Sequence, residues 1–389
     1  MEETKNIDQL DENSVEVENQ GDAVITVPFN PNLIRIRRDP FTLGELIDKM
    51  QYHEVNFQTA FQRKKDLWDA GKQSRLIESV LLRLPLPSFY FDEIIENEDS
   101  LEDRKAVWQV IDGLQRCSAF SNFIVEKSLA LTELEFLNFK DCKYDDLPRE
   151  LQRRIMQTPI TVYVVEKGTP EEVKFNIFKR INTGGLILTP QEIRHAMNQG
   201  VAAECVAEMA SDKNYRFREA TCNIIKTDRM EDQDFVTRFV AFYLQGYKSY
   251  QPDLDSFMTK GMGMIKKLSE VERTHMKQRF GKAMEMAIRI FGNDAFRKRT
   301  DASPFIRRRP INKALFEVES VVYARMTDVQ LERLMMNKRD FLERFINLNN
   351  DDKFRYAISS GTGQKDSVSK RYVDFIEIVQ QSINDTIDL

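Results

Sequence analysis

The sequence predicts an α+β protein in which a mixed domain over residues 31–200 precedes an all-helical domain over residues 201–389. Strand-like apolar runs alternate with helical patterns in the first part, whereas apolar residues recur every three to four positions in the second. The length of 389 residues suits two or three domains of roughly 150 residues each. Residues 1–30 carry eight Asp or Glu against one Lys and predict a disordered acidic tail.

The composition excludes several classes of protein. The net charge of −5 at pH 7 argues against bulk electrostatic binding of nucleic acid but allows a local basic face. No run approaches the roughly 18 apolar residues of a membrane-spanning helix, and the acidic N-terminus lacks a hydrophobic signal region. We therefore expect a cytoplasmic protein without a membrane partner. The four cysteines show no CxxC spacing and there are only three histidines, which disfavours a disulfide scaffold, a zinc ribbon and a His-Asn-His nuclease.

The first two helices of the mixed domain are marked by their ends. Thr42 opens a helix and has Glu45 three residues later, which is the spacing of a capping box. A second helix is expected over about 72–83, because apolar residues follow helical spacing there and Pro85 comes directly after it.

Three strands and three further helices follow in the mixed domain. Short apolar runs predict the strands, and Asp112-Gly113 and Pro170 mark turns that lead into helices. Thr189 at the N-cap, with Pro190 at the first helical position, starts the last of these helices. The expected strands are 88–94, 106–111 and 159–166, and the expected helices cover about 114–127, about 170–181, and the segment from Pro190 onward.

The turn at Asp112 and Gly113 is the first candidate site. A hydrophobic strand runs through this turn directly into a helix, whose first backbone N–H groups attract an anion such as phosphate. Gly113 permits a ligand to approach the backbone closely, and Arg116 suits bidentate binding of phosphate. Asp112 suits a metal ion or an oriented water molecule. The spacing leaves open a structural alternative, with Asp112 as an N-cap and Arg116 as a solvated surface residue.

A second polar cluster precedes the helix expected at 72–83. It contains Phe61-Gln62-Arg63, and Glu78 lies inside the helix beside its apolar stripe. A carboxylate in that position either lies at the edge of the stripe or points into a site. In the second case Glu78 and Asp112 are candidates to hold a metal ion together.

A third segment, Asn182-Thr183-Gly184-Gly185, ends one helix shortly before the next begins. Paired glycines adopt positive φ readily and leave backbone amides unpaired. The segment fits either a simple helix break or an anion site, and the flanking Arg180 and Arg194 favour the anion site.

The helical domain contains a basic run, from Arg297 to Arg299 and again at Arg307, Arg308 and Arg309. The last three arginines are candidates for contacts with DNA phosphates. Phe296 beside the run either stacks on bases or packs in the core. A solvated basic face is the alternative for the arginines.

Four segments taken in order resemble a known family. They are FQR, LIESVLLRLPLPSFYF, WQVIDGLQR and FKRINTGGLILTPQEIRHAM. Their order and spacing resemble the domain of unknown function 262 family, which is the GmrSD-type domain of bacterial anti-phage systems. The resemblance covers about residues 38–200 and implies a ParB/sulfiredoxin-like fold, with a small mixed sheet and helices.

The resemblance implies nucleotide handling. In ParB-like folds, the loop after a core strand and the start of the next helix bind the phosphates of a nucleoside triphosphate. The family's Asp-Gly-Gln-Gln-Arg signature is matched by Asp112, Gly113, Gln115 and Arg116, with Leu114 in place of its third residue. This match implies that Asp112, Gln115 and Arg116 are catalytic, that Gly113 binds nucleotide, and that Mg²⁺ and a nucleoside triphosphate are the cofactors.

Two other segments match the family's motifs. Phe61-Gln62-Arg63 corresponds to its Tyr-Gln-Arg, with Phe in place of Tyr, and the segment at 182–185 corresponds to its Asn-Thr-Gly-Gly. Many members carry a His-Asn-His-type nuclease domain, for which this chain has too few histidines. The further residues that the resemblance assigns to nucleotide binding are Gln62, Arg63, Asn182, Gly184 and Gly185.

Three functions are open from the sequence. The first is an enzyme that binds and hydrolyses a nucleoside triphosphate in a restriction-type defence system against foreign or modified DNA. The second, motivated by Leu114, is a module that senses nucleotide or DNA without turnover and gates a partner nuclease. The third is a metal-dependent DNA nuclease that uses Glu78 and Asp112. The expected partners are DNA and another defence protein, with a homo-oligomer also open.

Overall fold

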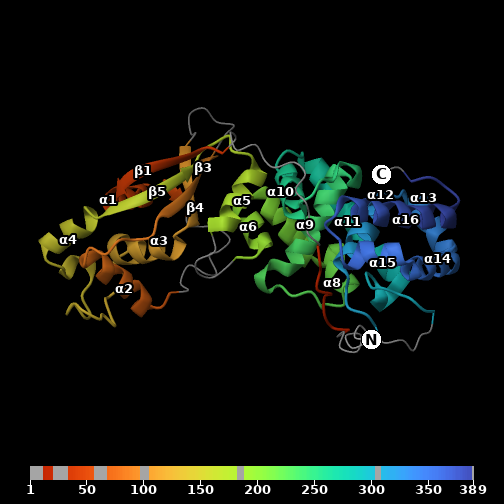
Figure 1. Ribbon diagram of the computed structural model, residues 1–389, viewed down its shortest axis with the longest axis horizontal. Helices are drawn as coiled ribbons and strands as arrows, with labels where there is room; N and C mark the ends of the chain where they lie inside the picture. Colours follow the sequence, from red (N-terminus) through yellow and green to blue (C-terminus); the bar gives the residue numbers. More distant parts are fainter. Residues whose placement is uncertain are drawn as a thin grey trace. The chain divides into compact units, whose positions relative to one another are not determined.

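The computed structural model describes residues 12–20, 34–56, 68–96, 105–181, 188–302 and 308–387. Backbone contacts divide the chain into two units; in Figure 1 the helices of the second unit are green to blue, and its N-terminal segment is red. The sheet unit comprises the described residues 34–181, and the helical unit comprises residues 12–20 together with 188–387. A mixed sheet in the first unit and helices in the second confirm the predicted α+β class.

The sheet unit is built on a five-stranded sheet in the order β1-β5-β3-β4-β2. β1 pairs antiparallel with β5, β5 parallel with β3, β3 antiparallel with β4, and β4 parallel with β2. The three strands predicted from apolar runs are the three central ones. The strands are β1 (Ile36–Thr42), β2 (Val55–Asn56), β3 (Phe89–Glu96), β4 (Lys105–Asp112) and β5 (Pro159–Val165).

The sequence does not predict the two edge strands. β1 reads Ile-Arg-Arg-Asp-Pro-Phe-Thr, and all of its residues are exposed or half-buried. It therefore lacks the alternation of a half-buried strand, and its charges and Pro40 are tolerated because they lie at a sheet edge. β2 has two residues, which is too short for a periodic signal.

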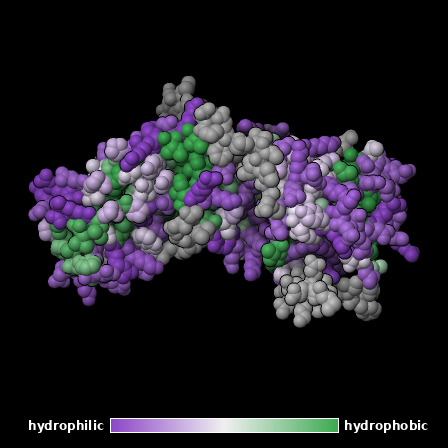
Figure 2. All heavy atoms as spheres, in the orientation of Figure 1, coloured by the Kyte–Doolittle hydropathy of each residue, from purple (hydrophilic) through white to green (hydrophobic). Residues whose placement is uncertain are grey.

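The core of the sheet unit lies against one face of the sheet. Buried Phe89 and Phe91 of β3 pack there with side chains from the helices α1, α2 and α3. α5 contacts the other face, where Lys174 Nζ lies 2.8 Å from Asp92 Oδ1 in a buried ion pair. At the end of the unit near α4, Figure 2 shows hydrophilic side chains with a hydrophobic patch directly below them. The helices are α1 (Leu43–Gln51), α2 (Ala70–Leu81), α3 (Leu114–Phe120), α4 (Arg149–Met156) and α5 (Glu171–Ile181).

Two predicted helix starts are confirmed in detail. Thr42 Oγ1 accepts the N–H of Glu45 at 3.3 Å, and the Glu45 carboxylate accepts the N–H of Thr42 at 2.7 Å. Thr189 and Glu192 make the same reciprocal pair at the start of α6 (Pro190–Met197), at 3.1 and 2.8 Å. Both are capping boxes, which satisfy backbone donors that the helix itself leaves unpaired.

The helix predicted over 114–127 consists of two parts. α3 ends at Phe120 and the π-helical turn η3 (Ser121–Val125) continues it, with the Glu126 N–H donating to the Ser121 carbonyl at 2.8 Å. Apolar spacing does not separate these parts, because a π-turn adds a single residue to the helical ladder.

The helical unit contains eleven α-helices in the described residues. None of the helices described is both long enough and apolar enough to cross a bilayer. Besides α6, the helices are α7 (Val201–Ser211), α8 (Phe217–Ala220), α9 (Glu231–Gln245), α10 (Leu254–Ile265), α11 (Glu270–Phe291), α12 (Lys313–Arg325), α13 (Asp328–Met336), α14 (Lys338–Asn350), α15 (Asp352–Ser359) and α16 (Lys365–Ile383).

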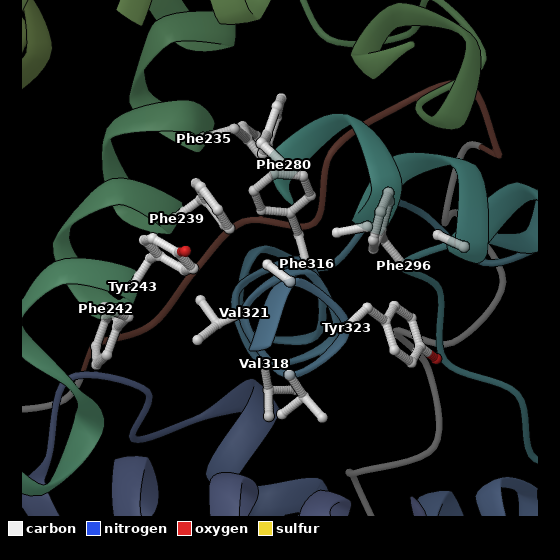
Figure 3. Close-up of a cluster of buried hydrophobic side chains, with 14 of the residues drawn as sticks. Phe235, Phe239, Phe242, Tyr243, Phe280, Phe296, Phe316, Val318, Val321 and Tyr323 are labelled. Atoms are coloured by element: carbon white, nitrogen blue, oxygen red, sulfur yellow. The ribbon is translucent and has the colours of Figure 1, made fainter. Parts of the chain in front are cut away.

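α12 is the central helix of this unit. Every residue from Ala314 to Ala324 is buried. Figure 3 shows α12 nearly end-on, with aromatic rings of α9 and α11 beside it. Phe235 of α9 meets Phe316 of α12 edge-on, with ring centroids 5.0 Å apart. A helix that is buried all round belongs to the interior of a large core, and here that core holds the helical unit together.

Residues 12–20 correct the prediction of a disordered tail over residues 1–30. Val15 forms a β-bridge with Ile311, and a Glu18 carboxylate oxygen lies 2.7 Å from Arg238 Nη1 inside the helical unit. Acidic residues of this segment therefore neutralise buried cations, which the composition of the segment cannot reveal. The remainder of the predicted tail lies outside the described residues.

α6 packs in the helical unit, although the sequence places residues up to 200 in the mixed domain. The Arg194 side chain is buried and lies 2.6 Å from Asp234 and 3.0 Å from Asp255. The guanidinium of Arg194 is therefore neutralised by two carboxylates in the helical core. This argues against the predicted role of Arg194 in an anion site.

Candidate functional site

The turn between β4 and α3 depends on Gly113. Its φ of 102° and ψ of 10° lie in the left-handed region, and a Cβ at this position would come within 2.7 Å of Phe89 Cδ1. Gly113 is the N-cap residue of α3, and no described side chain caps this helix. Asp112 therefore does not act as the N-cap, which was the structural alternative for it. The start of α3 remains a favourable place for an anion.

Arg116 is buried and donates hydrogen bonds to the residues directly before β3. Its guanidinium donates to the carbonyls of Pro87 and Ser88, the latter at 3.1 Å, and lies 4.4 Å from the ring centroid of Phe89. Its Nη2 also lies 3.0 Å from Asp112 Oδ2. Arg116 is therefore not the solvated surface residue of the structural alternative. It is fixed beside the turn by neighbours from two strands.

The structure brings the predicted catalytic residues together around one turn. The Asp112 side chain is 37% exposed and is oriented by its ion pair with Arg116. Gln115 Oε1 accepts the backbone N–H of Trp68 at 3.2 Å, just before the start of α2. The turn thus joins a partly exposed carboxylate, a carboxamide, a guanidinium and a glycine within five consecutive positions, residues 112–116.

Tyr90 is a neighbour of this turn that sequence reasoning missed. It pairs with Asp112 in the β3–β4 ladder, and its ring stacks on Tyr163 with centroids 4.9 Å apart. Burial, the adjacent Tyr163 and the Asp112 charge raise the pKa of Tyr90, so its hydroxyl stays protonated at neutral pH. The alternation Phe89-Tyr90-Phe91 was an available signal, because it places Tyr90 on the face opposite the core.

Glu78 does not lie in an open site. The side chain is buried, and its carboxylate accepts the backbone N–H groups of Glu135, Phe136 and Leu137 at 3.0, 2.8 and 2.7 Å. Burial alone would raise the pKa of Glu78, but these three hydrogen bonds lower it below the ordinary range. Glu78 is therefore ionised and anchors the 135–137 loop to α2. The described residues contain no group of three or more Asp, Glu, His or Cys that could hold a metal ion.

The predicted DNA-contacting arginines are only partly described. Arg308 Nε lies 3.1 Å from Asp294 Oδ1, and the Arg309 carbonyl accepts a hydrogen bond from Arg297. Phe296 is buried and packs on Phe316, so it serves the core rather than base stacking. The predicted site residues that lie outside the described residues are Gln62, Arg63, Asn182, Gly184, Gly185 and Arg307.

Comparison with protein families assigns the region that contains the turn. Residues 43–198 match the family described as GmrSD restriction endonuclease, N-terminal domain. This stretch of the chain is a GmrSD-type N-terminal domain, as the resemblance of the four motifs predicts. Comparisons with curated proteins and with solved structures gave no match.

The matched stretch does not coincide with one structural unit. It begins at the first residue of α1 and ends directly after α6, so its last helix packs with the helical unit. The turn at 112–116 and Glu78 lie inside the match, whereas the arginines at 307–309 lie outside it.

Proposed function

We propose that this chain binds and hydrolyses a nucleoside triphosphate as a component of a restriction-type defence system that acts on foreign or modified DNA. The observation that carries the proposal is the turn at residues 112–116, which lies inside the GmrSD-type domain and gathers Asp112, Gln115 and Arg116. The type of domain supports the restriction role, and the turn supports the nucleotide chemistry.

The turn has the features that phosphate binding requires. The Phe89 ring fills the space that a Cβ of Gly113 would take, so a phosphate would approach the turn through the N–H groups at the start of α3. No described side chain caps this helix, so its first N–H groups and its dipole favour an anion. Arg116 adds a fixed positive charge beside the turn.

Asp112 suits Mg²⁺ in the same place, because its carboxylate is partly exposed and oriented by Arg116. A bound magnesium–nucleotide complex would supply the phosphoanhydride bond that is cleaved. Asp112 would hold the metal ion or orient a water molecule. Gln115 would position the phosphate or the water molecule, and Arg116 would neutralise the charge that develops on the phosphate.

Arg116 would serve both the fold and the phosphate. A guanidinium has five N–H donors, and the bonds of Arg116 to Pro87, Ser88 and Asp112 use three of them. Replacement of Arg116 therefore also removes the attachment of β3 to the turn. Asp112→Asn is a cleaner variant, since it keeps the shape of the side chain and removes only its charge.

The test is phosphate release from ATP, GTP, CTP and UTP with Mg²⁺, with and without DNA. We expect Asp112→Asn and Arg116→Ala to lower the rate by about a hundredfold or more. Lys140→Gln, an exposed substitution in the same unit, is the control and keeps the rate of the parent. Melting temperatures of all variants separate loss of chemistry from loss of fold. Full turnover in a folded Asp112→Asn protein would refute the proposed site.

A sensor without turnover is the second candidate function. Leu114 motivates it, because this residue replaces the polar third position of the family signature and packs against the core of the sheet unit. A sensor would bind nucleotide tightly and change conformation without releasing phosphate. The nuclease alternative gains no support from Glu78, whose carboxylate is held by three backbone amides.

A further inference from the structure

A wide groove runs along one side of the sheet unit. Its lining includes none of residues 112–116. Its volume is about 1450 Å³, and β1, β5, α4 and the segment after α2 form its walls. We call it the arginine groove, because five arginines line it: Arg38, Arg83, Arg149, Arg153 and Arg154. α4 carries three of them.

The arginine groove is strongly positive within an acidic chain. Its lining holds five arginines against the carboxylates of Asp39 and Glu150, a balance of +3, whereas the whole chain has a net charge of −5. Asp39 is already paired with Arg37, outside the lining, at 2.7 Å. Glu150 is 85% exposed and lies 3.5 Å from Arg154. Within the described residues, the side chains of Arg38, Arg83, Arg149 and Arg153 form no ion pair or hydrogen bond.

Two of these arginines are neighbouring like charges on α4, and the first occupies an unfavourable position. Arg149 is the first residue of the helix, where the dipole disfavours a positive charge. Arg153 is one turn further along, so the two like charges are neighbours on the same face. Arg153 lies in the last turn of α4, where the dipole favours a positive charge, but repulsion from Arg149 opposes that gain, and both arginines line the groove. An anionic ligand in the groove would relieve this repulsion.

Arg83 also occupies a position that disfavours its residue type. The N–H groups of Arg83 and Leu84 donate to the carbonyls of Val80 and Ser79, at 3.0 and 2.9 Å. This is a Schellman motif at the end of α2, with Arg83 at the left-handed position that glycine usually fills. Its φ of 61° strains an arginine. Glycine would relax the backbone here, but it would remove one of the five arginines that line the groove.

We propose that the arginine groove binds the phosphate backbone of duplex DNA, a contact surface distinct from the turn at residues 112–116. The inference rests on the proposed function, in which DNA is the substrate. The arginines come from three separate parts of the chain, so they can follow a run of phosphates rather than one anion.

The lining favours duplex DNA over a free nucleotide or a single strand. It contains no glycine, and its single aromatic residue, Phe41, packs against the core. A nucleotide site normally offers a glycine-rich cradle, and single-strand sites offer aromatic rings for base stacking. The volume also exceeds the roughly 300–1000 Å³ of a small-molecule pocket. Contacts from arginine to phosphate position a duplex without reading its bases.

The test is binding of the full-length protein to a short labelled duplex, without nucleotide, over a range of salt concentrations. The double substitution Arg149→Gln with Arg153→Gln is expected to weaken binding about tenfold or more at low salt. It should also reduce the slope of log affinity against log salt by about 0.9 for each arginine lost. Lys140→Gln removes an exposed charge of the same unit outside the lining and should bind like the parent.

Arg83→Gly is the second variant, and it separates binding from folding. Glycine relieves the left-handed strain, so the melting temperature should stay the same or rise while DNA binding falls. A merely structural role of Arg83 would not produce this opposite pair of changes.

Several outcomes would overturn the inference. The inference fails if the parent protein does not bind duplex DNA, or if the groove variants bind it as tightly as the parent. It also fails if Lys140→Gln loses as much affinity for the duplex as the groove variants do. Displacement of the duplex by a nucleoside triphosphate at constant ionic strength, in the Arg116→Ala variant, would make the groove a nucleotide site instead. Apart from this displacement experiment, the binding assay contains no nucleotide. Its result therefore does not depend on whether the protein hydrolyses a nucleoside triphosphate.

Discussion

Gly113 shows how much of the candidate site a single residue determines. An Asp-Gly pair after an apolar run is a turn signal, so the sequence could predict the turn itself. It could not predict that Phe89 lies against Gly113, because that contact depends on the pairing of β3 with β4. The same holds for Arg116. Its proximity to Asp112 follows from the helix spacing, whereas its bonds to Pro87 and Ser88 follow from the sheet.

We expect Gly113→Ala to lower the free energy of unfolding by about 2–3 kcal/mol. The left-handed conformation of a residue with a Cβ costs roughly 1–2 kcal/mol, and the contact with Phe89 adds about 1 kcal/mol of overpacking. Urea denaturation measures the loss. Gly168→Ala is the matched control in the same unit, because its φ is 91° and the nearest atom to a new Cβ is 3.5 Å away. Equal losses in both variants would show that the Phe89 contact is unimportant.

At the scale of elements, the central strands and the capped helices could be predicted because each has a local signal. Apolar runs mark β3, β4 and β5, and Thr42 and Thr189 start helices with capping boxes. β1 could not be predicted, since its exposed charges make sense only at a sheet edge. The role of Glu78 also depends on tertiary structure, because its partners lie in a loop more than fifty positions further along the chain.

We expect Glu78→Gln to destabilise the protein by about 2–3 kcal/mol, because it replaces charge-assisted hydrogen bonds and presents an N–H group to backbone donors. Urea denaturation measures the loss, and hydrogen exchange of the 135–137 amides should accelerate. Glu150→Gln is the control, with an 85% exposed side chain and a single ion pair, and its effect should be near zero. A stable Glu78→Gln protein that loses Mg²⁺ binding would instead support the metal role.

At the scale of the whole molecule, buried ion pairs tie distant parts of the helical unit together. Arg238 bridges Glu18 of the N-terminal segment and Glu317 of α12, at 2.7 and 2.6 Å. Arg371 of α16 lies 2.7 Å from the same Glu317, and both side chains are fully buried. Removal of one member would leave an uncompensated buried charge, which is costly.

These carboxylates predict the response to acid. Burial opposes ionisation of Glu18 and Asp234, but Arg238 holds the pKa of Glu18 below its ordinary range, and Lys313 and Arg194 do so for Asp234. A lowered folded-state pKa gives stability that is complete above the ordinary values of 4.5 and 3.8 and is lost as the pH falls below them. Thermal unfolding should therefore shift to lower temperature as the pH falls below about 4.5. Glu18→Gln should flatten this dependence, whereas exposed Glu343→Gln should not. If the melting temperature of Glu18→Gln depended on pH as that of the parent does, Glu18 would not be a source of the acid sensitivity.

Residues 12–20 pack in the helical unit but precede the sheet unit in the sequence, and this order has a consequence for synthesis on the ribosome. This segment is made first, yet its partners Arg238, Ile311 and Glu317 are made only after the whole sheet unit. At roughly 5–20 residues per second, Glu18 waits on the order of tens of seconds for its buried neighbours. The sheet unit can thus finish folding while residues 12–20 still lack their partners in the helical unit. An expression fragment that starts after residue 20 would produce α9 and α12 without the carboxylate that Arg238 requires.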